Sequence, residues 1–179
     1  MYILILFIIS LLVFRLNPVP LEKVSSKDVF KYGFLTLVLY FASVAVQAVF
    51  IHFGMTSNVN LGEMSTDMGI PLMVFLILVF SPFIEEFLFR FGIIEGLNYI
   101  LRKLKIKNTI LLNFIIIAIS AACFSIAHSG GIGQTVYTFL LGMYLGYLYV
   151  KKRNLLFTIG MHMLFNSISI GLFLVNTII

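Results

Sequence analysis

Two adjacent carboxylates, Glu85 and Glu86, stand in an otherwise apolar stretch of this 179-residue sequence. On a helix, a Glu four residues before an Arg lies on the same face and can form an ion pair, which predicts that Glu86 pairs with Arg90. Glu85 points about 100° away and is left without that partner. Pro82 has no N–H, so it should kink the helix one turn earlier and free nearby carbonyls. A water-filled pocket could begin at such a place.

Imidazole and amide side chains follow later at the same helical spacing. Phe124 lies four residues before His128 and should cover one side of its ring. His162 and Asn166 are also four residues apart. With Glu85, these polar groups are available to line an internal cavity from three helices. Each one alone could be a hydrogen bond between helices. Together they carry a cost that a bundle could avoid with leucine, and we therefore interpret them as a functional site.

The composition places these polar groups in a membrane. Hydrophobic residues make up 61% of the chain and charged residues 11%, whereas soluble proteins have roughly 45–50% and about 25%. Mean hydropathy is +1.10. Most of the surface must therefore face lipid, which excludes a soluble enzyme, a disordered tail and a disulfide scaffold. The single cysteine, Cys123, is interpreted as a small buried hydrophobic residue.

Six apolar segments are candidates for membrane crossings, each of which needs about 20 residues. They are residues 2–14, 33–53, 70–91, 109–127, 134–150 and 155–178. The first is short for a crossing. Gly142 and Gly146 form a small-xxx-small pair that allows close helix packing. The sequence thus predicts an all-α polytopic transmembrane bundle of about six helices.

All 12 Lys and Arg residues fall in or beside alternate connections between these segments. The first, third and fifth connections carry them, and the second and fourth carry none. By the positive-inside rule the basic connections are cytoplasmic and both termini lie outside. The net charge of +5 is therefore interpreted as contact with membrane lipids of an anionic leaflet, and not as nucleic-acid binding.

Three further expectations concern single residues. Glu95, just beyond Arg90, should join a charge network at the cytoplasmic end. Tyr137, like the other tyrosines of its segment, should pack or lie at the membrane interface and stay outside the site. His128 should not match Glu85 in depth: a helix entering at Thr109 carries it to the outer surface, and a tilted, later entry still leaves a mismatch of about two turns.

Three motifs taken in order carry a family resemblance: Glu-Glu-x-x-x-Arg at 85–90, Phe-x-x-x-His at 124–128 and His-x-x-x-Asn at 162–166. They resemble the motifs of the CPBP family, also called Abi or CAAX-protease-like, which are intramembrane proteases. The family includes prenyl-protein endopeptidases and bacteriocin-processing or bacteriocin-immunity proteins. The resemblance covers residues 81–166 and implies residence in a bacterial cell membrane.

The resemblance implies a role for each motif residue. Glu85 and His128 would act on the water that attacks the scissile carbonyl, and His162 and Asn166 would donate hydrogen bonds to the oxyanion. Three more residues would support them: Glu86, Arg90 and Phe124. The substrate would be a hydrophobic or lipidated peptide or protein, cleaved in CAAX-type processing, bacteriocin maturation or self-immunity.

The same resemblance divides the chain. Residues 81–179 would be the catalytic core and residues 1–80 the N-terminal transmembrane helices, together one integral-membrane domain.

Three alternatives stay open. Glu85, His128 and His162 could bind zinc as the cofactor, with Glu86 as the base; the absence of a His-Glu-x-x-His signature favours a site without metal. A non-enzymatic bacteriocin immunity protein could use the same residues as a binding pocket for the peptide or its receptor. A proton-coupled transporter also needs an intramembrane Glu and His.

Overall fold

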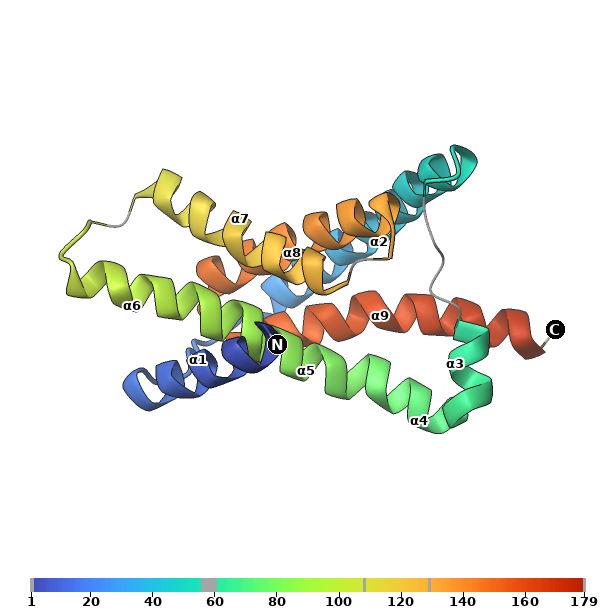
Figure 1. Cartoon of the computed structure of the whole chain (residues 1–179), viewed down its shortest axis with the longest axis horizontal. Coiled ribbons are helices and arrows are strands. Elements are labelled where there is room, and N and C mark those ends of the chain that lie inside the picture. The colour runs from blue at the N-terminus through green and yellow to red at the C-terminus, as the bar shows by residue number, and fades with distance from the viewer. Residues whose placement is uncertain (1, 56–60, 108, 129, 179) are drawn as a thin grey trace.

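The computed structural model describes residues 2–55, 61–107, 109–128 and 130–178. Over these residues the chain is all-α, with an isolated β-bridge between Leu21 and Asn154. The first three helices are α1 (Tyr2–Leu16), α2 (Ser26–His52) and α3 (Leu61–Met68); the last three are α7 (Ile110–Ala127), α8 (Ile132–Lys152) and α9 (Leu155–Ile178). Figure 1 shows their course.

A continuous 34-residue helix, Ile70–Lys103, lies between these two groups, and we call it the central helix. It consists of α4 (Ile70–Phe75), a π-helical segment (Leu76–Phe80), α5 (Ser81–Glu86), a second π-helical segment (Phe87–Glu95) and α6 (Gly96–Lys103). Both π segments adjoin α5, which carries the two adjacent carboxylates. Counted in this way, the described residues form seven helices.

Each predicted apolar segment is a helix, and the main differences lie at the ends. The helix α2 begins earlier than predicted because Ser25 caps it by accepting a hydrogen bond from the backbone N–H of Asp28, 3.2 Å away. The central helix continues past the predicted end near Phe91 to Lys103. The short α3 was not predicted, because its eight residues are too few and too polar to resemble a crossing.

Four helices are long and apolar enough to cross a membrane: Ser26–His52, Ile70–Lys103, Ile110–Ala127 and Leu155–Asn176. The helix α1 is apolar but shorter, and α8 is more polar than these four. Large apolar side chains such as Phe30, Leu111 and Ile110 are exposed on the surface of the bundle. The chain is therefore an integral membrane protein.

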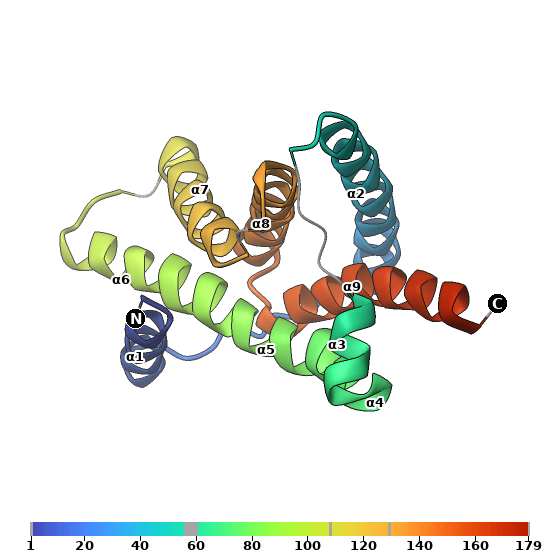
Figure 2. The same cartoon turned by 45° about the vertical axis from the view of Figure 1, so that its right-hand side comes forward.

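Close packing joins α8 to its neighbours. Figure 2 shows α8 between α7 and α2, and it contacts both. A Cβ added at Gly142 would lie 2.9 Å from Cα of Ala121, and one at Gly146 would lie 2.8 Å from Cγ2 of Ile117. The two glycines thus let α7 approach α8 as the small-residue spacing predicts.

Substitution of Gly142 should test this contact. We expect Gly142→Ala to lower the stability of the bundle by about 1–3 kcal/mol, because the new methyl group meets the backbone of Ala121, which cannot turn away. Thermal unfolding in detergent measures the loss. Gly160→Ala is the matched control, because no atom lies within 4 Å of the added Cβ there. Equal melting temperatures for the two variants would contradict the prediction.

Candidate active site

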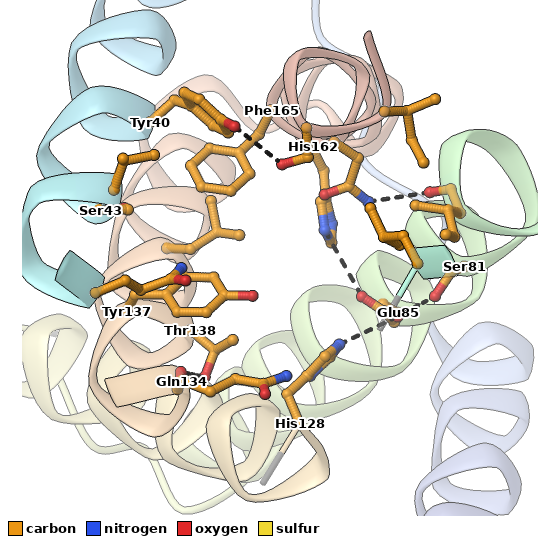
Figure 3. A pocket seen from close by; sticks show the side chains of 18 of the residues that line it. Tyr40, Ser43, Ser81, Glu85, His128, Gln134, Tyr137, Thr138, His162 and Phe165 are labelled. Carbon is orange, nitrogen blue, oxygen red and sulfur yellow. Dashed lines mark hydrogen bonds and ion pairs between the residues drawn. The ribbon is translucent and has the colours of Figure 1, made fainter. Parts of the chain in front are cut away.

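A cavity of about 780 Å³ lies between the central helix and helices α2, α8 and α9, with the end of α7 at its edge. Glu85, His128, His162 and Asn166 all line it, from the central helix, α7 and α9. Figure 3 shows Glu85 with His128 and His162 pointing toward it from different elements. The structure thus brings together the four residues that the motifs singled out.

Glu85 is held by three side chains. Its Oε1 lies 3.5 Å from Nε2 of His128, and its Oε2 lies 3.7 Å from Nε2 of His162. Ser81, one turn earlier on the same helix, donates a hydrogen bond to Oε1. Glu85 thus has no ion pair with Arg90, as expected, but the contact with Ser81 was not predicted. The spacing of four residues between Ser81 and Glu85 would have revealed this contact in the sequence.

His128 lies level with Glu85, which corrects the expected mismatch in depth. The central helix and α7 are joined by one short connection. From Glu85 to Lys103 there are 18 residues, or about 27 Å of helix, and from Thr109 to His128 there are 19, or about 28 Å. The sequence-based estimate ended the central helix near Phe91, which placed Glu85 too close to that connection.

Two contacts with Phe124 hold the ring of His128 in place. Its Nδ1 donates to the backbone carbonyl of Phe124 at 2.9 Å. The ring of Phe124 lies 4.4 Å from the imidazole, measured between centroids, which confirms the predicted contact. Because Nδ1 is the donor, Nε2 of a neutral His128 carries the lone pair and faces Glu85.

Glu86 connects the central helix to α9 and is fully buried. Its Oε2 lies 3.0 Å from Nε of Arg90, as the spacing predicted. Its Oε1 accepts a hydrogen bond of 2.8 Å from Nδ1 of His162, a contact that the sequence did not predict. This bond turns Nε2 of His162 toward the cavity and Glu85. The two adjacent carboxylates thus have different surroundings: the Glu86 side chain is fully buried, whereas the Glu85 side chain is 15% exposed.

The guanidinium of Arg90 is also fully buried. It lies over the ring of Phe124, with Cζ 4.7 Å from the ring centroid. Its nitrogens have no hydrogen-bond partner among the described residues, although Nε is paired electrostatically with Glu86. Arg90 therefore depends on the charge of Glu86 and on the face of Phe124 to offset its removal from water.

Asn166 has a structural contact as well as a place at the cavity. In the first π segment the N–H of Ser81 donates to the carbonyl of Leu76, five residues back. In that register the carbonyl of Ile77 would need an N–H from residue 82, which is proline. Nδ2 of Asn166 donates to this carbonyl at 3.0 Å. The expectation that Pro82 frees a carbonyl is thus met, and Asn166 is the group that satisfies it.

The wall opposite Glu85 is polar and was missed. It contains Gln134, Tyr137 and Thr138 of α8, with Tyr40 and Ser43 of α2 (Figure 3). The expectation that Tyr137 stays outside the site is therefore wrong. A spacing of three and four residues places the three α8 side chains on one helix face. That polar stripe was visible in the sequence, but the surrounding tyrosines were interpreted together as packing residues.

Zinc would need a set of ligands that converge on one point of the cavity. A zinc site needs several His, Cys, Asp or Glu atoms at about 2.0–2.3 Å from one ion. In the described part of the chain no three such side chains are grouped to hold a metal ion. This result does not support zinc binding by Glu85, His128 and His162, which stays an alternative to the metal-free scheme.

Comparison with known protein families gives a match. The family model described as "Type II CAAX prenyl endopeptidase Rce1-like" matches residues 67–168, more than half of the chain. The matched region includes all three motifs and the whole central helix, Ile70–Lys103. No curated protein matches the chain. No solved structure matches it either.

The two carboxylates should respond differently to loss of charge. We expect Glu86→Gln to lower stability by about 3–5 kcal/mol, because it leaves Arg90 charged and buried without a counter-ion. Glu85→Gln should change it by less than about 1 kcal/mol, because that side chain reaches the cavity and the amide keeps its size. Thermal unfolding in detergent compares the two, and a greater loss for Glu85→Gln would disprove the assignment.

Proposed function

Because this chain belongs to the Rce1-like family of type II CAAX prenyl endopeptidases, a family of proteases, we propose that it is an intramembrane endopeptidase that uses an activated water. The observation that carries the proposal is the position of the Glu85 carboxylate between two imidazoles at the wall of a large cavity. A carboxylate and a histidine that face one point are suited to general base catalysis.

The proposed first step is activation of water by Glu85 and His128. A water beside Glu85 Oε1 and His128 Nε2, atoms that are 3.5 Å apart, can donate one hydrogen bond to each. As its oxygen attacks the scissile carbonyl carbon, one proton passes to the Glu85 carboxylate. The carbonyl oxygen becomes an oxyanion, and the carbonyl carbon, now bonded to four groups, becomes tetrahedral.

His162 and Asn166 are proposed to stabilise the oxyanion. The Nε2 of His162 faces the cavity. Because Nδ1 donates to Glu86, Nε2 donates to the oxyanion in the form of the ring that is protonated on both nitrogens. Asn166 uses one amide hydrogen for Ile77, which leaves the second for the substrate. Preorganised donors of this kind require no reorganisation during the reaction.

Collapse of the intermediate completes the hydrolysis. The carbonyl re-forms, the carbon–nitrogen bond breaks, and the leaving amine takes the proton from Glu85. The products are one peptide with a new carboxyl group and one with a new amino group. Glu86 and Arg90 act as positioning residues in this scheme, because they hold His162 and do not reach the reacting atoms.

The cavity supports an uncharged, hydrophobic or lipidated peptide as the substrate. Apolar residues such as Leu141, Phe165 and Phe173 line much of it, and neutral hydrogen-bonding groups form the wall around Gln134. A segment that unwinds for cleavage inside a membrane frees backbone N–H and C=O groups that must find partners. Neutral side chains can supply them. CAAX-type processing and bacteriocin maturation are both compatible with such a substrate.

Comparison of membrane peptidomes tests proteolysis without knowledge of the substrate. We expect host cells with the wild-type chain to contain fragments that are absent with Glu85→Gln at equal abundance, because loss of the general base slows hydrolysis by roughly 10²–10⁴-fold. Glu22→Gln is the matched control, since Glu22 is exposed and distant from the cavity. Identical peptidomes for wild type and Glu85→Gln would favour a non-enzymatic immunity protein.

Metal removal should leave the activity intact. Because the proposed steps use only the side chains of the site, with Glu85 and His128 acting on the water, we expect the purified protease to cleave the peptides identified above equally well before and after dialysis against a chelator. Metal analysis of the same samples provides the control. One tightly bound zinc per chain, lost in His162→Ala, would contradict this expectation.

A further inference from the structure

The basic residues gather at one end of the bundle. Apart from the buried Arg90, they lie at the end of α1, in the following connection and first turns of α2, at the end of α6 with the connection to α7, and at the end of α8. Figure 1 shows the turn between α6 and α7 at one extreme of the molecule and the end of α2 toward the other. We call the end of the bundle that contains the turn between α6 and α7 the basic end.

Polar contacts hold these segments together at the basic end. Arg102 donates to Asn17 at 2.9 Å, which joins α6 to the residue after α1. Lys152 lies 2.6 Å from Asp28, which joins the end of α8 to the start of α2. Arg153 forms an ion pair with the buried Glu95 of the central helix, which confirms Glu95 as part of a charge network there.

The cavity lies toward the opposite end on several helices. Glu85 is 18 residues, or about 27 Å of helix, from Lys103. On α2, Gln47 of the cavity wall is 16 residues, or about 24 Å, from Lys31. On α8, Tyr137 and Lys151 are 14 residues, or about 21 Å, apart. On α9, His162 is 9 residues, or about 14 Å, from Arg153, and the other lining residues of α9 lie farther along, up to Phe173. The cavity residues of these four helices therefore begin about 14 Å from the basic end and continue away from it.

The end of the bundle that holds the cavity carries no basic residue. Leu61 and Met64 line the cavity, so it extends to α3, the helix that follows α2. Neither that connection nor the one between α7 and α8 contains Lys or Arg, and none of the residues outside the described ranges is Lys or Arg. A segregation of this kind fixes how a helix bundle inserts, with its basic connections in the cytoplasm.

We infer that the catalytic cavity opens to the non-cytoplasmic side of the membrane, and that its substrates are uncharged peptide segments that reach it from that side. Exported hydrophobic peptides and the outer juxtamembrane segments of membrane-anchored proteins have this chemistry and this location. The substrate part of the inference rests on the proposed protease function, whereas the sidedness rests only on the charge distribution and the place of the cavity.

Chemical labelling of single cysteines tests the sidedness. In a Cys123→Ala background, Gln47→Cys places a thiol at the cavity wall and Lys107→Cys places the matched control at the basic end. A membrane-impermeant maleimide is applied to right-side-out spheroplasts and to inverted vesicles. We expect Gln47→Cys to react in spheroplasts and to lose labelling in inverted vesicles, and Lys107→Cys to show the reverse.

Other outcomes of the labelling would overturn the inference. Labelling of both thiols from the same side would show that the cavity and the basic end share a compartment. A second cavity position, Ser169→Cys, guards against a local defect at residue 47. If neither cavity thiol reacts even in detergent, the cavity is closed to water and the inference fails. None of these results depends on catalysis, so they are distinguishable from failure of the protease proposal.

The fragments from the peptidome comparison test the substrate part. We expect their cleavage points to map to exported peptides or to segments on the non-cytoplasmic side of their parent proteins. Fragments drawn only from cytoplasmic segments would overturn this part, while still supporting proteolysis.

Discussion

The burial of Glu86 is the constraint on which the arrangement of the site depends. A carboxylate without any solvent exposure is tolerable only with charged or hydrogen-bonding partners, and Glu86 has Arg90 on its own helix and His162 on α9. The pair Glu86–Arg90 alone would fix only one helix. The third partner ties α9 to the central helix and sets the imidazole ring angle, so one buried charge determines where a candidate catalytic group points.

Helix geometry places the two adjacent carboxylates in different environments, one in the interior and one at the cavity. A rotation of about 100° between neighbouring residues sends Glu86 into the interior and Glu85 to the cavity wall. One side chain is thereby satisfied by fixed partners, and the other meets imidazole nitrogens at 3.5 and 3.7 Å, so that a water beside them can contact both the carboxylate and an imidazole. A single carboxylate could not both anchor α9 and accept a proton in the proposed hydrolysis.

Sequence reasoning predicted two contacts within a helix but missed that of Ser81 with Glu85, and it did not predict the bond that joins Glu86 to α9. The spacing of Glu86 and Arg90 and that of Phe124 and His128 were sufficient, because periodicity fixes which residues share a face. The bond between Glu86 and His162 spans 76 positions, and no local pattern encodes it. The depth of His128 failed for another reason: it depended on where the central helix ends, and apolar runs locate helix ends poorly when a polar helix end such as α6 continues beyond them.

The place of Asn166 shows how a backbone irregularity and a functional motif become linked. A proline in the central helix leaves the carbonyl of Ile77 without a backbone donor, and inside a membrane such a carbonyl needs another partner. Asn166 supplies it from α9, one helical turn from His162. A leucine at 166 would leave that carbonyl unpaired, and a helix without Pro82 would no longer need the amide. The amide that Pro82 requires thus belongs to a residue that also lines the cavity.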